Sequence, residues 1–342
     1  MTAERASPVA GFRLLVGEED ISDRARPRLV SLTLTEKRGG EADQLDLVLD
    51  DADGRLDIPP KGAAIALQLG WLRGAGVTVG LIDKGRFTVD QIEWSGPPDQ
   101  LRITARSADL TAGYRTRREA SHRDTTLGAV AGAVAQRHGL TARVAHELAD
   151  VAVPVLEQHG QSDMAMLRAL GRRHDAVATV KRGALILSPI GRGAAPSGRA
   201  LPALSISPDQ VTRSYRYAEI ERSADAGVEA RWHDQDSAER KTVREGGGGQ
   251  GRGAPKRLGR VYNSEAEARA AARAAANRAK RAEASFELTL SLGRPDVYPE
   301  QAVTLAGFKP PVDARRWLIA EVTHELAPNT GLETRLKLET AG

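Results

Sequence analysis

The chain has 342 residues, 41% hydrophobic and 27% charged, with a formal net charge of +4. This size suits two or three domains, and the composition is typical of a globular protein. Cysteine is absent, which excludes a disulfide framework, a thiolate metal site and a cysteine nucleophile. The mild, nearly balanced charge does not by itself indicate a nucleic-acid partner. No apolar run approaches the roughly 18 residues that span a bilayer and no signal peptide is recognised, so we expect synthesis in the cytoplasm without membrane insertion.

Residues 1–112 predict a domain built of strands. Five short runs alternate between apolar and polar residues, and clusters of Gly, Pro and Asp separate them. The runs are RLVSLTLTEK, DQLDLVLDD, AAIALQLGW, RFTVDQIEW and DQLRITARS. Several short strands with turn signals between them indicate a β-barrel or a sandwich.

Residues 113–202 predict a small α+β insertion domain. The run TTLGAVAGAVAQRHG has one apolar helical face, and Gly139 is a suitable stop. SDMAMLRALGRRHD predicts a second helix, in which Ser162 is the N-cap and Asp163 faces the positive end of the helix dipole. AVATV and ALILS flank a turn at Lys181–Gly183 and predict a hairpin.

Residues 203–342 return to strand-like patterning with two interruptions. The first, GGGGQGRGAPK at 246–256, has the composition of a flexible loop. The second, at 264–284, predicts a helix rich in Ala and Arg, with Ser264 and Glu267 as a capping box. We therefore predict a second β domain that includes this loop and this helix.

The second β domain contains a partial copy of the first. FTVDQIEWSGPPDQLRIT can be aligned with WLIAEVTHELAPNTGLETRLKLE, so that Phe87 falls on Trp317 and Trp94 on His324. Upstream of each hairpin, AIAL and AVTL occupy matching places before a Gly and an aromatic residue. The fold expected is therefore α+β, with two related β-barrel domains. His324 is expected to be a packing position rather than a catalytic one, because its counterpart is a tryptophan.

No catalytic or metal-binding motif is complete. His324-Glu325 lacks the second histidine of a zincin, and Asp51–Gly54 starts like a calcium loop but lacks the glutamate at its twelfth position. The Gly-rich stretch 246–256 lacks the Lys-Ser/Thr end of a phosphate-binding loop. Two alternatives remain open: a cell-wall hydrolase, which needs converging carboxylates, and a nucleic-acid-binding protein acting through the Arg-rich helix.

The segment EQHGQSDMAMLRALGRRHDAVATVKRGALILSP carries a more specific signal. It resembles the Q-x-x-x-S-D-x-x-F-L-x-R-L-x-x-x-x-G pattern of phage late control D proteins, which also occurs in the hub portion of type VI secretion VgrG spike proteins. The matching positions are Gln158, Ser162, Asp163, Leu167 and Leu170. Met166 replaces the usual aromatic residue, and Asp175 stands where glycine is usual.

The C-terminal region resembles the ending of the same family. An Ala- and Arg-rich helix precedes GRPDVYPEQAVTLAGF and then the hairpin that starts RRWLIAEVTHEL. Glu300 or Gln301 stands where the family pattern has a glycine. The resemblance covers nearly the whole chain, and its strength lies in the order of its short motifs.

This resemblance implies a structural protein and not an enzyme, namely a baseplate hub of a contractile tail or injection machine, assembled into a virion. Such hubs are trimers in which each chain supplies two similar β-barrels, so six similar units join the sixfold tail tube to the threefold spike. The edges of the two hairpins are the expected contact surfaces, marked by Phe87, Trp94, Trp317 and His324.

The implied partners are further copies of the chain, the tail tube protein, the tape-measure protein and a spike. We expect the spike to be a separate polypeptide, because the chain ends at Gly342 without the spike domains of VgrG proteins. DNA is expected only as transported cargo, and no cofactor is implied.

Overall fold

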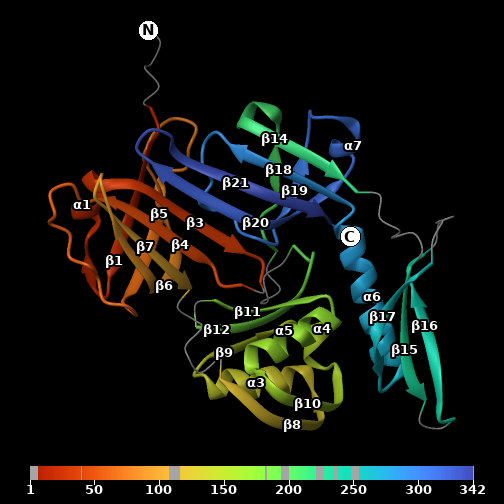
Figure 1. The fold of residues 1–342 in the computed structure, drawn as a ribbon. Helices are drawn as coiled ribbons and strands as arrows, with labels where there is room; N and C mark the ends of the chain where they lie inside the picture. Colours follow the sequence, from red (N-terminus) through yellow and green to blue (C-terminus); the bar gives the residue numbers. More distant parts are fainter. Residues whose placement is uncertain are drawn as a thin grey trace.

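The structure is a computed structural model that describes residues 7–39, 41–107, 116–181, 183–193, 200–220, 227–234, 237–247 and 254–341. Within these ranges the chain is a β-rich α+β protein with three parts: a body of two β units, an insertion domain against that body, and an arm to one side (Figure 1). None of the helices in these ranges is both long enough and apolar enough to cross a membrane.

The first β unit contains all five strands predicted for residues 28–107. They are β3 (Leu29–Lys37), β4 (Gln44–Asp50), β5 (Ala64–Arg73), β6 (Gly80–Ser95) and β7 (Gln100–Ser107). The structure adds β1 (Val9–Val16), β2 (Glu19–Asp20), the short helix α1 (Ser22–Ala25) and a 3-10 turn at Arg26–Arg28. Alternation along these strands turns one set of side chains into a shared core, which includes Phe12, Leu34 and Phe87.

The second β unit is formed by segments on both sides of the arm. Its strands are β13 (Leu204–Ile206), β14 (Val211–Glu219), β18 (Ala284–Leu290), β19 (Ala302–Leu305), β20 (Arg316–Ala327) and β21 (Gly331–Thr340). A 3-10 turn at Pro208–Gln210 and the short helix α7 (Pro310–Asp313) complete it. Phe286 and Trp317 lie in its core with ring centroids 5.9 Å apart.

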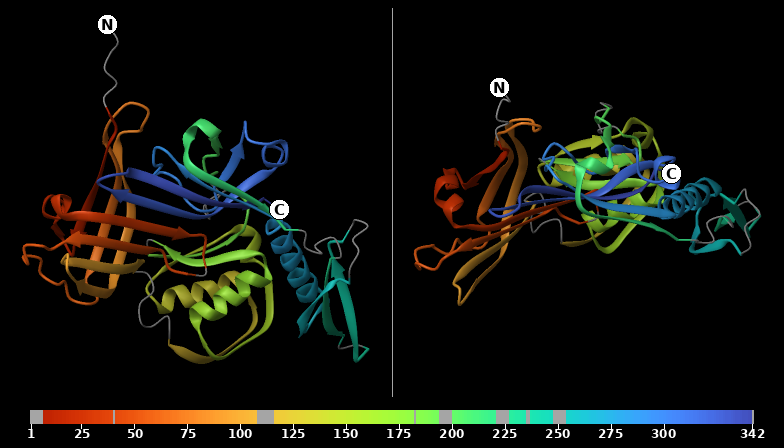
Figure 2. Two further views of the ribbon diagram at one scale, coloured as in Figure 1. Left: turned by 45° about the horizontal axis from the view of Figure 1, so that its top comes forward. Right: turned by 90° about the horizontal axis from the view of Figure 1, so that it is seen from above.

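Both units belong to one sheet, because β3 of the first unit pairs with β20 of the second. The main path runs β14-β18-β21-β20-β3-β4-β7-β6-β5-β1-β2, with β19 paired to β20 and β13 paired to β19. These pairings form an open path among the described residues, so the closure of each unit into a barrel remains an expectation. Figure 2 shows the two units side by side from two further directions.

The insertion domain contains both predicted helices and the predicted hairpin. Helix α3 (Leu127–Arg137) and helix α5 (Asp163–Arg173) are preceded by Thr126 and Ser162, whose hydroxyls accept hydrogen bonds from Ala129 N and Ala165 N. The other elements are β8 (Arg117–Thr126), β9 (Thr141–Val144), α4 (His146–Ala149), β10 (Ala152–Ser162), β11 (Ala176–Lys181) and β12 (Ala184–Pro189). Strands β11 and β12 are the predicted hairpin, and β9 joins them in a three-stranded sheet.

The arm is a separate sheet covered by a helix, which the sequence analysis did not distinguish from the second β unit. Its strands are β15 (Val228–Asp234), β16 (Glu239–Glu245) and β17 (Lys256–Tyr262), in the order β16-β15-β17, and its helix is α6 (Glu265–Arg281). The alanine face of α6 packs on this sheet, since small side chains allow a close approach. Ser264 caps the helix as predicted, but the helix ends at Arg281 and β18 begins at Ala284. Residues 248–253 of the predicted loop lie outside the described residues.

Candidate functional site: the junction of the two β units

The hairpins β6–β7 and β20–β21 share one pattern of strand pairing. In each, the register shifts at a single bulge, which directly follows Val89 in β6 and Ile319 in β20. Phe87 and Trp317 each lie two residues before the bulged strand leaves register. Counted from the bulge, Trp94 and His324 also occupy the same position, facing β7 and β21 respectively.

The strand preceding each hairpin is attached in the same way. Ile65 of β5 faces Phe87, and Val303 of β19 faces Trp317. The correspondence extends beyond both strands, since the amides of Gly62 and Glu300 donate to Val89 O and Ile319 O, both at 2.9 Å. Gly62 and Glu300 also share a left-handed backbone, with φ of +83° and +74°. The units differ at their margin, because β1 is antiparallel to β5 whereas β13 is parallel to β19.

One edge of β20 is divided between the two units. Its first residues pair with β19, and residues 321–326 pair with β3 of the first unit. In this pairing His324 faces Leu34 and Val322 faces Glu36. The junction is therefore a continuous strand pair that covers the core of both units.

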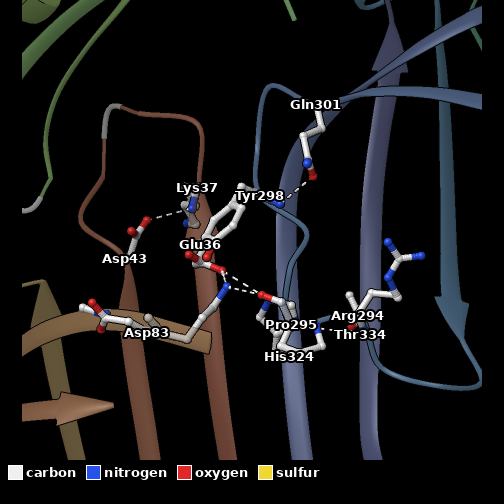
Figure 3. Close-up of polar contacts among 12 residues, drawn as sticks. Glu36, Lys37, Asp43, Asp83, Arg294, Pro295, Tyr298, Gln301, His324 and Thr334 are labelled. Carbon is white, nitrogen blue, oxygen red and sulfur yellow. Dashed lines mark hydrogen bonds and ion pairs between the residues drawn. The ribbon is translucent and has the colours of Figure 1, made fainter. Parts of the chain in front are cut away.

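A buried polar chain crosses this junction at His324 (Figure 3). The backbone N–H of Arg294 donates to Thr334 Oγ1 (2.8 Å), so the hydroxyl proton of Thr334 is free to donate to His324 Nδ1 (2.9 Å). His324 Nε2 lies 3.2 Å from a carboxylate oxygen of Glu36 and donates to it. This order assigns the neutral Nε2–H tautomer to His324.

Lys84 of β6 completes this cluster from the first unit. Its Nζ lies 2.6 Å from Glu36 Oε2, donates to Pro295 O at 3.0 Å and stands 4.1 Å from the centre of the Tyr298 ring. The side chains of Lys84 and Glu36 are almost fully buried. An ion pair buried in this way is satisfied only while both units remain in contact, because Pro295 and Tyr298 belong to the second unit.

The surroundings favour the charged form of Glu36 but the neutral form of His324. Burial alone would raise the pKa of Glu36, but the hydrogen bond from His324 and the charge of Lys84 lower it to about 2. Burial lowers the pKa of His324, and the hydrogen bond to Glu36 only partly opposes this. Burial also lowers the pKa of Lys84, and the charge of Glu36 and its hydrogen bond with Lys84 only partly oppose this. The cluster therefore favours an ionised Glu36 and a neutral His324.

A second set of ion pairs joins the β units to the insertion domain and the arm. Arg38, which follows β3, pairs with Glu300 and with Glu339 (Nη1 to Oε1, 2.6 Å). Arg281 at the end of α6 pairs with the same Glu339 (Nε to Oε1, 3.1 Å) and binds both carboxylate oxygens of Asp175. Two arginines and three carboxylates thus connect all parts of the chain.

The family-motif residues form a third buried cluster inside the insertion domain. Both carboxylate oxygens of Asp163 lie 2.9 Å from Arg137 Nη1, while Gln158 Nε2 donates to Oδ1 at 3.0 Å and His138 Nε2 lies 2.8 Å from Oδ2. Burial alone would raise the pKa of Asp163, but the hydrogen bonds from Gln158, His138 and Arg137 lower it. Ser162 caps α5 and Leu167 and Leu170 lie in the core, so the motif holds the insertion domain together.

The other hairpin residues singled out in the sequence analysis differ in burial. Phe87 and Trp317 are buried in the cores of the two units, so only the backbone edges of their strands can face another chain. Trp94 is 56% exposed, and its Nε1 donates to Asp51 at 3.2 Å. Residues Glu36 and Lys84 were missed by sequence reasoning. The signal for Glu36 was present, because it continues the inward-facing alternation of Leu32 and Leu34.

The arginines of α6 contact protein groups. Arg269 pairs with Glu245 and Glu265, and Arg278 donates to the carbonyl of Arg172 in the insertion domain. Together with Arg281, these contacts use the basic face of the helix to hold the parts of the chain together. They favour protein contact over the nucleic-acid alternative for this helix.

Comparison with known proteins identifies the family. Residues 44–330 match the family model described as "Phage tail baseplate hub (GPD)". The chain belongs to this baseplate hub family. The resemblance to late control D proteins is thereby confirmed, and the role in this family is structural, not enzymatic.

The sequences of two relatives align with that of this hub along almost their whole length. The probable baseplate hub protein of Escherichia phage 186 is 37% identical over 377 residues, which cover 99% of this chain and 95% of the relative. The probable baseplate hub protein of Escherichia phage P2 is 36% identical over 370 residues, covering 96% and 92%. The hub is therefore a structural component of phage tails.

Solved structures support the fold of the hub. A tail protein from Neisseria meningitidis MC58 has a TM-score of 0.71 and 12% identity, covering 97% of this chain and 96% of that one. The 43 kDa tail protein of prophage MuSo2 from Shewanella oneidensis has a TM-score of 0.69 and 15% identity, covering 96% and 98%. A type VI secretion component of E. coli, c3393, has a TM-score of 0.56 and 13% identity, covering 91% and 73%.

Proposed function

We propose that this baseplate hub acts as a trimer whose two β units per chain form a ring of six similar positions. The observation that carries the proposal is the shared register of β6–β7 and β20–β21, together with the shared attachment of β5 and β19. Two equivalent units in one chain allow a threefold assembly to present six similar surfaces. Such a ring would match a sixfold tail tube on one side, while the insertion domain and the arm, present once per chain, keep threefold symmetry for a separate spike.

The proposed partners follow from this geometry. The tail tube would contact the surface that repeats six times, and the spike would contact the elements that occur three times. The tape-measure protein and transported DNA would occupy the central passage. In this proposal each unit closes into a β-barrel within the ring, and the hub has no catalytic step.

The mass of the purified full chain in solution tests this proposal. At tens of micromolar, sedimentation should give the mass of three chains, and electron micrographs should show rings with approximate sixfold symmetry. Co-expression of wild-type and tagged chains provides the control, because a trimer yields four species, with zero to three tags, and a dimer yields three. A chain that stays monomeric through this range, alone and after mixing with its proposed spike protein, contradicts the ring.

A further inference from the structure

We infer that the seam between two copies of this chain is a strand pair between β14 of one copy and residues 91–95 of β6 in the next, in the register of the internal β3–β20 pair. This inference rests on the proposed trimer and assigns its contact surface. The internal junction supplies the template, since it already joins one unit to another.

Strand β14 is the counterpart of β3 in the second unit. In the first unit, Leu34 pairs with Leu45 of β4, and β4 pairs in turn with β7. In the second unit, Tyr217 pairs with Phe286 of β18, and β18 pairs in turn with β21. Following the two hairpins through these pairings aligns Leu32 with Tyr215, Leu34 with Tyr217 and Glu36 with Glu219.

The two aligned strands differ in what covers their outer edge. β3 is paired on both sides, whereas β14 ends the sheet path and pairs only with β18 among the described residues. In β3, Leu32, Leu34 and Glu36 are buried. Tyr215 is 58% exposed, although its ring stacks on Phe286 at 5.7 Å. An edge strand with unpaired backbone groups and an exposed aromatic side chain is suited to accept another strand.

The matching acceptor edge lies on β6. Strand β6 pairs with β5 only up to Thr88, so the same edge of residues 91–95 has no strand beside it in the described part of the chain. The equivalent edge of β20, residues 321–326, is the one that β3 occupies. Trp94 stands on this free edge at the place of His324 and is largely exposed.

The charges at the two seams also correspond. Glu36 is paired with Lys84 from the start of β6, and Glu219 is paired with Arg315, which directly precedes β20. The internal pair is buried under β20, whereas Glu219 and Arg315 remain partly exposed, with the Tyr217 hydroxyl donating to Glu219 at 2.8 Å. A second copy placed by the template would cover this pair, as the second unit covers Glu36 and Lys84.

The template fixes the register of the seam. Internally, Thr323 faces Thr35, His324 faces Leu34 and Glu325 faces Thr33. Transferred to the seam, these three pairs become Glu93 with Ala218, Trp94 with Tyr217 and Ser95 with Arg216. Leu326, which faces Leu32, has Gly96 as its counterpart, so the space beside the exposed ring of Tyr215 stays open in this register.

Disulfide trapping tests the seam in the full-length chain, which has no native cysteine. The variants E93C/A218C and S95C/R216C place thiols at facing positions and should form disulfide-linked dimers and trimers under mild oxidation. The crossed variants E93C/R216C and S95C/A218C carry the same four substitutions out of register and should lose most of this linkage. Linkage within one chain is excluded because β14 and β6 are separated by six strands of the sheet path.

Wild-type mass, measured on the same samples, separates this inference from the proposed trimer. A trimeric wild type whose facing and crossed variants link equally, or do not link, overturns the seam and leaves the trimer intact. A monomeric wild type with no linkage in any variant overturns both. A trimer that links only through the facing pairs supports both.

Discussion

Asp175 and Glu300 lie at the two ends of one chain of ion pairs, and both have a left-handed backbone, with φ of +52° and +74°. The family pattern has glycine at or next to both positions. A left-handed conformation costs an L-residue about 1 kcal/mol, and here each side chain offsets that cost by pairing with an arginine. Asp175 binds Arg281, Glu300 binds Arg38, and both arginines share Glu339.

Replacing Asp175 by Asn should therefore lower the free energy of unfolding by about 2 kcal/mol. Asparagine tolerates the left-handed backbone, so the substitution removes only the charge and leaves the buried Arg281 with Glu339 alone. Urea unfolding followed by circular dichroism measures the change. Asp124→Asn is the matched control, because Asp124 is exposed and has φ of +46°, and its change should stay within about 0.5 kcal/mol. Equal losses in the two variants would show that the backbone conformation, and not the ion pair, decides the effect.

The junction cluster should make stability fall in mildly acidic solution. Burial lowers the pKa of His324, so below about pH 6.5 the unfolded chain binds a proton that the folded chain does not. The free energy of unfolding then decreases by up to about 1.4 kcal/mol per pH unit as the pH falls from 6.5 toward the lowered pKa of folded His324. Glu36 contributes only below about pH 4.5, because its folded pKa is about 2. Between pH 6.5 and 5 Glu36 does not contribute, but His174 does, because burial lowers its pKa as well. The comparison of wild type with a variant at His324 separates the two histidines.

His324→Gln measures this contribution. The variant should be less stable than wild type at pH 7.5, and the difference should shrink between pH 6.5 and 5, since glutamine does not titrate. Urea midpoints followed by tryptophan fluorescence report the change. His146→Gln alters an exposed histidine and should keep the wild-type pH profile. A pH-independent gap between His324→Gln and wild type would rule out titration of His324 as the cause.

Asp163 should be a stability determinant of the insertion domain. Asp163→Asn keeps the shape of the side chain but removes the charge that accepts hydrogen bonds from Arg137 and Gln158, and should cost about 3 kcal/mol. Hydrogen exchange of α3 and α5 would show the loss of protection locally. Glu119→Gln, at an exposed carboxylate that contacts His159, should cost no more than about 0.5 kcal/mol. Unchanged protection in Asp163→Asn would mean that the apolar core alone holds α5.

Local signals were sufficient for most elements of this protein. Alternation with turn residues between the runs predicted β3 to β7, and caps with an apolar face predicted α3 and α5. β8 and β10 were missed, because they are polar strands of a two-stranded sheet whose alternation is weak. The arm sheet was assigned to the wrong neighbour for a related reason: alternation identifies a strand but not the sheet that it joins.

The repeat shows where sequence reasoning ends. Aligning Phe87 with Trp317 required only the pattern of apolar residues. In the structure, the two strands pair with β7 and β21 in equivalent registers. The exposure of Trp94 and the burial of His324 could not be predicted from the sequence. They depend on whether another strand pairs with the edge of β6 or β20 on which each residue lies. For His324 the cover is β3 of the same chain, whereas no strand among the described residues covers the edge at Trp94.

By itself, the sequence determined the α+β class, the repeated hairpin and the resemblance to tail hub proteins, because these follow from periodicity and from short motifs in a given order. Only the tertiary structure decided that Glu36, Lys84 and His324 meet, since they come from three strands that are far apart in the chain. It also decided which strand edges remain open. Charges that are unremarkable in the sequence become determinants of the junction because folding removes them from water together.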